Sequence, residues 1–489
     1  MKSEWYPAEM NRMMEKNIRS NHFLSLAFNR QWLKENLPPY LWRENEISDE
    51  IAHVEILHVW ESSKRITILY QIDLKRSNGE IRQQMYVGYL VADERFADEQ
   101  KSALKKGKIQ PLTGRAVTII PEANLILLAY PNDRKMQLLS AEDLQSWLGE
   151  HWREIADDSL NGNDWRIQNT KVEMLRYVPD KRFTALCRVR LQDENALSRE
   201  VSFVAKQLSD EKKAKRLYRN LRLLQTAWPE NSANRRSRLT AKPPIRLPKA
   251  LAWDEKRAVV FIEEIAGKNL KQALPEIDPA RVMPAVGALL AIFHRARKRV
   301  RKQVTIKNEL AEVREAMRTI AKALPHLKRR MRQFYKQFKT WRWEDEAPQV
   351  LLHGTYRLNH IFINGSELAL LDLDSLRLGH PAYDLANFLS SLYYLEEQQR
   401  LTQALRRDLA RHFLEGYTAE TLSNIHPGAV LWFLASLLIN KQASKYVNHD
   451  HEDQEEKVMR MLALAEATLS DGQNLPGNLT LSALWKVLQ

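Results

Sequence analysis

Two carboxylates follow a histidine-containing loop within residues 351–389, and their spacing could support chemistry. The segment HIFINGSELALLDLD predicts two strands joined at Asn364-Gly365, because Asn-Gly between alternating apolar runs is a strong hairpin signal. We expect the second strand to end at Asp372 and Asp374, which would share one face because they are two residues apart. Paired carboxylates there suit Mg²⁺, which takes one or two carboxylates together with substrate phosphates. The sequence therefore predicts a metal site.

The alternative for these acids is structural, since acids at loop entries often cap backbone amides. That alternative applies best to Asp384, in GHPAYDLANFL, which follows a proline turn at an expected helix start. A carboxylate at such a position accepts backbone N–H bonds. We therefore expect a structural role for Asp384.

A lysine on a second expected strand is a candidate phosphate ligand. Side chains alternate along a strand, so Lys206 should share a face with Val204 and Leu208. A lysine among apolar neighbours is costly unless an anion meets it, which favours a phosphate-binding role. The alternative is a lysine on the solvent face of an edge strand.

Two parts of the chain resemble each other. VEILHVWESSKRITILYQIDL begins at Val54 and VEMLRYVPDKRFTALCRVRL begins at Val172, and each predicts two strands around a turn that ends in Lys-Arg. A third strand follows each pair, and Tyr89 takes the place in the first copy that Lys206 takes in the second. Self-similarity of this kind indicates a duplicated module, although two unrelated β meanders could also match by alternation alone.

Length and periodicity predict several structural units. A chain of 489 residues exceeds one ordinary domain. We expect a mixed N-terminal domain, a β-rich block around one helix, a mostly helical block that contains the hairpin, and a tail. Their expected boundaries are 1–155, 156–272, 273–470 and 471–489. The one cysteine, Cys187, excludes a disulfide framework within the chain.

Lysine and arginine number 75 against 61 aspartates and glutamates, and the excess gathers at 294–304 and 327–339. We interpret these runs as solvated helix faces, with an anionic small substrate as the alternative. We do not expect nucleic acid as a partner, since no aromatic RNA-binding motif or zinc-finger spacing accompanies the charge. The start lacks an apolar signal segment, and the longest apolar run, 429–439, is too short to span a bilayer. These features predict a cytoplasmic protein without a membrane span.

From about Val172 to Lys441 the chain resembles the aminoglycoside phosphotransferase and choline kinase-like superfamily. LRYVPDKRFTALCRVRL resembles its phosphate-loop hairpin, FVAKQL its lysine strand, VVFIEEIAGKNL its hinge, and LLDLD its metal-binding motif. The resemblance implies an α+β, bilobal protein-kinase-like fold with a β-rich N-lobe and a helical C-lobe. The extra α+β domain in front would be a degenerate copy of the N-lobe. The implied cofactors are ATP and Mg²⁺.

The resemblance also implies roles for individual residues. Lys206 would hold the ATP phosphates beside a hairpin turn that carries Lys181 and Arg182. Asp372 would bind the metal, and His294 would be structural. The remaining implied positions are the hinge residues Glu263, Glu264 and Ile265, the loop residues His353 and Thr355, and the further metal-site residues Asp374 and His360.

Two departures from the family pattern bear on activity. The family loop usually reads His-Gly-Asp, with Asn or Gln five residues after the aspartate, whereas this chain has Thr355 and His360 there. Threonine is no base at neutral pH, and imidazole prefers softer metals than Mg²⁺. The partner glutamate for Lys206 is also not obvious, with Glu211 as the nearest candidate. Two functions stay open: phosphoryl transfer to a hydroxyl of a small acceptor, or a pseudokinase that senses nucleotide or scaffolds a protein partner.

Overall fold

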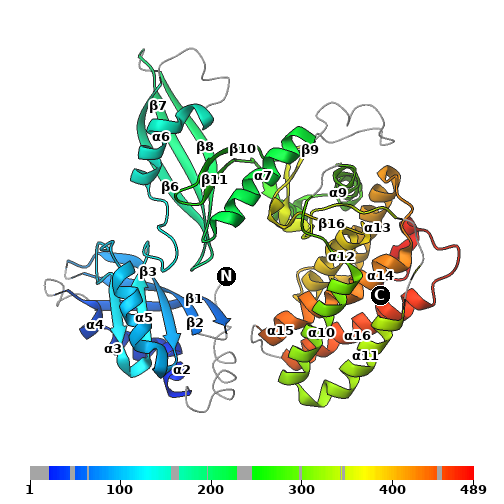
Figure 1. Cartoon of the computed structure of the whole chain (residues 1–489), viewed down its shortest axis with the longest axis horizontal. Coiled ribbons are helices and arrows are strands. Elements are labelled where there is room, and N and C mark those ends of the chain that lie inside the picture. The colour runs from blue at the N-terminus through cyan, green and yellow to red at the C-terminus, as the bar shows by residue number, and fades with distance from the viewer. Residues whose placement is uncertain are drawn as a thin grey trace. The chain divides into compact units, whose positions relative to one another are not determined.

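The computed structural model describes residues 21–43, 50–62, 65–76, 78–155, 165–194, 197–227, 245–296, 300–341, 343, 347–448 and 454–488. They form two compact units (Figure 1). The first comprises mainly Met1–Lys215 and Leu251–Ile262, and the second mainly Arg216–Ala250, Glu263–His449 and Asp453–Gln489. Strands dominate the first unit and helices the second.

The first unit contains two five-stranded sheets with the same topology. Their strand orders are β1–β2–β3–β5–β4 and β6–β7–β8–β11–β10. In each sheet three long strands form an antiparallel meander, a helix follows, and the last strand returns to pair with the third. The first set comprises β1 (Glu50–Ser62), β2 (Arg65–Lys75), β3 (Ile81–Val91), α5 (Asp93–Lys106), β4 (Val117–Ile120) and β5 (Leu125–Ala129). The second set comprises β6 (Arg166–Val178), β7 (Arg182–Gln192), β8 (Ser198–Leu208), α7 (Glu211–Ala227), β10 (Ala250–Asp254) and β11 (Val259–Glu263).

The two sheets also agree in register. The pairing of β1 with β2 shifts at Leu57, and that of β6 with β7 shifts at Leu175, so the leucine of Val-Glu-x-Leu is the extra residue in both strands. Tyr89 pairs with a threonine on β2, and Lys206 pairs with a threonine on β7. Shared topology, bulge and register support a duplicated module, because alternation alone does not place a bulge.

The two sheets differ in whether the face that carries Tyr89 or Lys206 is covered. Tyr89 is only 1% exposed and lies in the same core cluster as Phe203 and Ala205. Because β8 alternates, Lys206 points to the opposite side from Phe203 and is half-exposed. Lys206 therefore lies with Val204 and Leu208 on a half-exposed face, since the core of this unit lies on the other face of β8.

Helices cover both sheets of the first unit. The short helices α2 (Asn21–Phe28), α3 (Arg30–Asn36) and α4 (Pro38–Leu41) share a core cluster with the first sheet. Helix α6 (Ala141–Ile155) contributes Trp147, whose ring lies 4.5 Å from that of Phe261 on β11. These helices bury the apolar rows that the alternating strands present.

The second unit is mainly a bundle of helices. Its long helices are α9 (Pro279–His294), α10 (Ile306–Ala323), α11 (Lys328–Thr340), α12 (Ala382–Glu397), α13 (Gln403–Glu420), α14 (Pro427–Leu437) and α16 (Gln454–Gln473). Helices α9 and α13 pass very closely, because a Cβ on Gly287 would meet the backbone at Phe413 and one on Gly416 would meet Pro284. This approach brings His294 beside Tyr417.

Two small sheets carry the hairpin of the second unit. Strands β14 (Ile361–Asn364) and β15 (Glu367–Leu370) pair as the sequence predicts, although the loop is Gly365-Ser366, with Gly365 at φ 59°. They join β12 (Lys268–Asn269) and β9 (Ile245–Arg246), while β13 (Val350–Leu352) pairs with β16 (Arg377–Gly379). Because β14 and β15 pair, the loop before the hairpin and the acids Asp372 and Asp374 after it lie at the same end of the hairpin.

The apolar and basic runs have the structures expected of a folded protein. All of α14 is buried, as predicted for the run 429–439. No helix among the described residues is long and apolar enough to cross a membrane. Helix α11 buries Met331, Phe334 and Phe338 and leaves most of its basic residues exposed, which confirms a solvated face for 327–339. Within the run 294–304, residues 297–299 lie outside the described residues.

Candidate active site

One buried carboxylate holds the loop that begins at His353. The backbone N–H groups of His353 and Gly354 donate to Asp384 at 2.7 and 2.8 Å, and His294 Nε2 lies 3.3 Å from the same carboxylate. Burial raises the pKa of Asp384, but these hydrogen bonds and nearby histidines outweigh it and leave the pKa below its ordinary value. A structural role was predicted, yet the partners belong to the loop, whereas α12 begins after Pro381 with no side-chain cap.

The His353 ring braces the loop from inside. Nε2 lies 2.9 Å from the carbonyl oxygen of Leu371, and burial lowers the pKa of this fully buried ring. A neutral imidazole would then donate from Nε2 and present the Nδ1 lone pair to Thr355. The Thr355 amide nitrogen and Oγ1 lie 3.3 and 3.4 Å from Nδ1. Thr355 is thus held by His353, and the ring faces protein on both sides.

The predicted metal-site histidine interacts with an arginine. Arg357 donates from Nε and Nη2 to His360 Nε2 at 3.1 and 2.9 Å, while His360 Nδ1 lies 2.9 Å from the carbonyl oxygen of Thr355. Burial first, and then the Arg357 charge, lower the pKa of His360 to about 3. The Nε2 lone pair is therefore occupied by a cation, and His360 does not fit the role of metal ligand.

The two acids of the LDLD motif stand beyond the strand that precedes them. Strand β15 ends at Leu370, Asp372 has φ 62°, and Asp374 lies in the 3-10 turn Leu373–Ser375, so strand alternation does not pair them as predicted. Asp372 Oδ2 lies 3.3 Å from His360 Nε2, which brings this acid to the loop. No three His, Cys, Asp or Glu side chains in the described part of the chain converge as metal ligands. The residues fit a cation held by Asp372 together with nucleotide phosphates, since Mg²⁺ needs only one or two carboxylates.

The other predicted nucleotide residues lie in the first unit and the hinge. Lys206 is half-exposed on β8, Lys181 is exposed, and Arg182 begins β7. At the hinge the Glu263 N–H donates to the Lys249 carbonyl at 2.9 Å. The remaining hinge positions, 264 and 265, are both half-buried.

The hairpin turn between β6 and β7 docks on the first sheet. Asp180 forms an ion pair with Arg65 and accepts a hydrogen bond from the Tyr89 hydroxyl at 3.2 Å. The Asp180 N–H and the Tyr177 hydroxyl both donate to Asp133, at 2.8 and 2.7 Å. The turn that the family resemblance assigns to phosphate binding is therefore fixed by the N-terminal copy.

Sequence reasoning missed three basic residues of the second unit. Arg357 stands two residues after Thr355, and its place in the loop could have identified it. Lys441 and Lys445 gave no local signal, since the π-helical turn Leu438–Ala443 and α15 (Ser444–Asn448) carry them from far along the chain. Burial lowers the pKa of each lysine to about 8.

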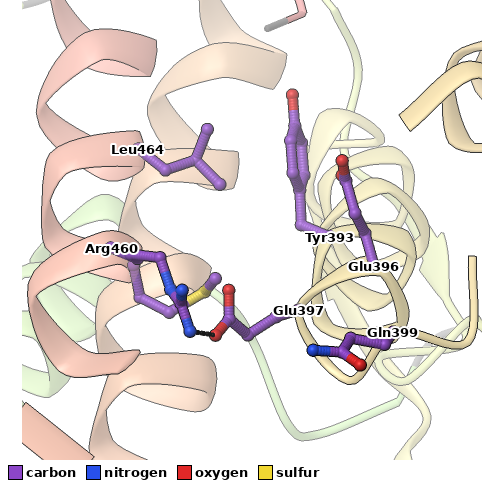
Figure 2. A pocket seen from close by; sticks show the side chains of 7 residues that line it. Tyr393, Glu396, Glu397, Gln399, Arg460 and Leu464 are labelled. Atoms are coloured by element: carbon purple, nitrogen blue, oxygen red, sulfur yellow. Dashed lines mark hydrogen bonds and ion pairs between the residues drawn. The ribbon is translucent and has the colours of Figure 1, made fainter. Parts of the chain in front are cut away.

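A separate pocket of about 310 Å³ lies between α12 and α16 (Figure 2). Its charged lining is already paired, because Glu397 forms an ion pair with Arg460 and Glu396 with Arg406. These pairs neutralise the charged side chains of the pocket internally.

Part of the chain is similar to known proteins. Residues 189–422 match the model of the Phosphotransferase enzyme family, APH. No curated protein sequence matches the chain. Similar solved structures include a choline kinase from Cryptosporidium parvum Iowa II, with 13% identity, a TM-score of 0.44 and coverage of 68% of this chain and 97% of that one. A choline/ethanolamine kinase family protein from Mesorhizobium loti has 11% identity, a TM-score of 0.39 and coverage of 71% and 98%.

A third similar structure is the macrolide 2′-phosphotransferase from Brachybacterium faecium, with 15% identity, a TM-score of 0.38 and coverage of 69% of this chain and 100% of that one. The family match includes Lys206, the whole loop from His353 to His360, and both acids of the LDLD motif. Residues 189–422 are therefore similar to the phosphotransferase enzyme family, in agreement with the resemblance predicted from the sequence.

Proposed function

We propose that this protein binds ATP and transfers its γ-phosphoryl group slowly to a hydroxyl of a small acceptor. The observation that carries the proposal is the set of hydrogen bonds from His353 and Gly354 to Asp384, which keeps the loop in one shape. Phosphoryl transfer depends mainly on positioning and electrostatic stabilisation, which such a loop can supply without a base.

The roles of the residues follow from their chemistry. Lys206 would neutralise phosphate charge, and Mg²⁺ held by Asp372 would withdraw charge from the transferring group when bound. The Thr355 hydroxyl can orient an acceptor through a hydrogen bond but cannot take its proton. His353 is enclosed by its two contacts, so the acceptor proton must leave to water. Since a general base contributes roughly 10²–10⁴ in rate, we expect slow turnover.

The Thr355→Asp substitution tests the proposal. A carboxylate at residue 355 should raise turnover about tenfold or more, within the range of general-base catalysis. Phosphate release and acceptor labelling at saturating ATP and Mg²⁺ would measure it in the wild type, Thr355→Asp and Thr355→Val. The valine variant controls for the loss of the hydroxyl at similar side-chain volume. Fast wild-type turnover that falls in Thr355→Asp would refute a defective base and indicate that threonine serves an altered active site.

The contact between Arg357 and His360 favours a second function, a pseudokinase that binds nucleotide without transfer. A guanidinium beside Asp372 supplies positive charge where the family pattern expects metal ligands. Under this alternative, ATP would raise the melting temperature equally with Mg²⁺ and with a chelator, and Thr355→Asp would stay inactive. A protein partner would then bind the nucleotide-bound form of the chain in preference to the free form.

A further inference from the structure

We propose that a cationic cluster beside the loop binds the phosphate group of a phosphorylated acceptor. The cluster consists of Lys271, Arg357, Lys441 and Lys445, all in the second unit. This inference rests on the proposed function, because it names the acceptor class of that site.

The two lysines are half-buried and bound to amide oxygens. Lys441 Nζ donates to Asn387 Oδ1 at 2.6 Å, and Lys445 Nζ donates to Gln442 Oε1 at 2.9 Å. Lys445 also lies 4.0 Å above the ring of Tyr394. An amide or an aromatic face orients an ammonium group but does not neutralise it, so both lysines keep capacity for an anion.

The charges of the cluster members act on one another. Burial has the largest effect and lowers the pKa of Lys271, Lys441 and Lys445, and the Arg357 charge lowers each pKa further. For Lys441 the charges of Glu309 and Asp384 oppose this, but its pKa stays below the ordinary value. Like charges held together away from bulk water are costly unless an anion lies among them. Such unfavourable electrostatics are typical of a site whose ligand supplies the missing charge.

The nearby carboxylates have other partners. Buried Glu309 accepts hydrogen bonds from Ser436 and Asn440, and burial raises its pKa. Asp384 is bound to the loop. These acids only partly offset the cations. A doubly charged phosphate monoester suits two lysines and an arginine better than a single carboxylate does.

The backbone that carries the lysines is itself unusual. Leu438–Ala443 forms a π-helical turn. Such turns are rare in proteins, and those that occur are often found at functional sites. Lys441 lies in this turn, and Lys445 follows four residues later on α15, so both can reach one ligand. The turn thus adds a second, independent sign of a built site.

Thermal unfolding with inorganic phosphate and with glycerol 3-phosphate tests the proposal at constant ionic strength. Both should raise the melting temperature of the wild type by mass action. Lys445→Met and Lys441→Met should each weaken binding about tenfold or more, because each removes a charge-assisted contact. Both variants should melt at or above the wild-type temperature without ligand, since a penalised charge is gone. Lys336→Met, an exposed lysine on α11, should bind like the wild type.

Lys445→Gln adds a polar variant that cannot carry charge, so a folding defect in one substitution does not decide the outcome. Phosphate binding that survives both methionine variants would overturn the proposal, as would an equal response to acetate, which would indicate a carboxylate site. Competition between phosphate and ATP would also overturn it, because the cluster would then hold nucleotide phosphates. Failure of ATP itself to bind would refute the proposed function, whereas the phosphate titrations would still test the cationic cluster.

Discussion

The two sheets of the first unit have the same topology, but the equivalent face is buried in the first sheet and half-exposed in the second. In the second sheet the face that carries Lys206 is half-exposed. In the first sheet the equivalent face carries Tyr89, which is buried and hydrogen-bonded to Asp180 of the second copy. A face covered by its neighbour cannot admit a nucleotide. The first sheet therefore supports the hairpin turn of the second sheet.

The network around Asp180 shows how this support works. Arg65 and Tyr89 come from the first sheet, and Asp133 follows its last strand, yet all three converge on one turn. Arg65 and Arg134 also lie over the Tyr89 ring, at 5.2 and 5.0 Å. Buried polar networks of this kind are costly when one member is missing.

The largest effect is expected from Asp180→Ala. Loss of this carboxylate leaves Arg65 and the Tyr89 hydroxyl without their buried partner, which should lower the free energy of unfolding by roughly 2–3 kcal/mol. Urea unfolding would measure it, with exposed Lys181→Ala as the neighbouring control. If Asp180→Ala is as stable as that control, the first copy does not support the turn through this network.

A smaller effect is expected from Lys206→Met, which removes the charge that distinguishes the two faces. ATP affinity should fall about tenfold or more, while the ligand-free melting temperature stays nearly unchanged because the side chain is half-exposed. Calorimetric titration with ATP would measure it. The matched control is Tyr89→Phe at the equivalent register. A similar loss of ATP affinity in Tyr89→Phe would show that the first copy still takes part in nucleotide binding.

The smallest effect is a pH dependence of the free energy of unfolding, caused by Asp180 in the turn that docks on the first sheet. Burial first, and then the charge of Asp133, raise the pKa of Asp180 despite the opposing arginines. An acid whose folded pKa is raised stabilises the fold below its unfolded pKa, about 3.9, and that stabilisation is lost as pH rises through the folded value. Unfolding free energies of the wild type, relative to Asp180→Asn, should therefore decline with pH above about 4. A relative increase would mean that Arg65 outweighs burial.

Much of the local structure followed from the residues themselves. The hairpin at Gly365, the buried helix at 429–439 and the repeated meander all rest on periodicity and turn chemistry, which act over a few residues. The loop at His353 and the acid at Asp372 were identified for the same reason, as short motifs. Domain boundaries and the roles of the site residues stay predictions.

Other features required the tertiary structure. Alternation states that Lys206 and Val204 share a face, but only packing decides which face of a strand is covered. The sequence did not show that Arg357 donates a hydrogen bond to His360. It also did not show that Asp384 accepts hydrogen bonds from the loop instead of capping its own helix. Lys441 reaches Asn387 because helices distant in the chain pack together. The sequence by itself determined the elements and their motifs, through short-range geometry. Only the tertiary structure decided which charges meet, because burial and electrostatic contact depend on residues far apart in the chain.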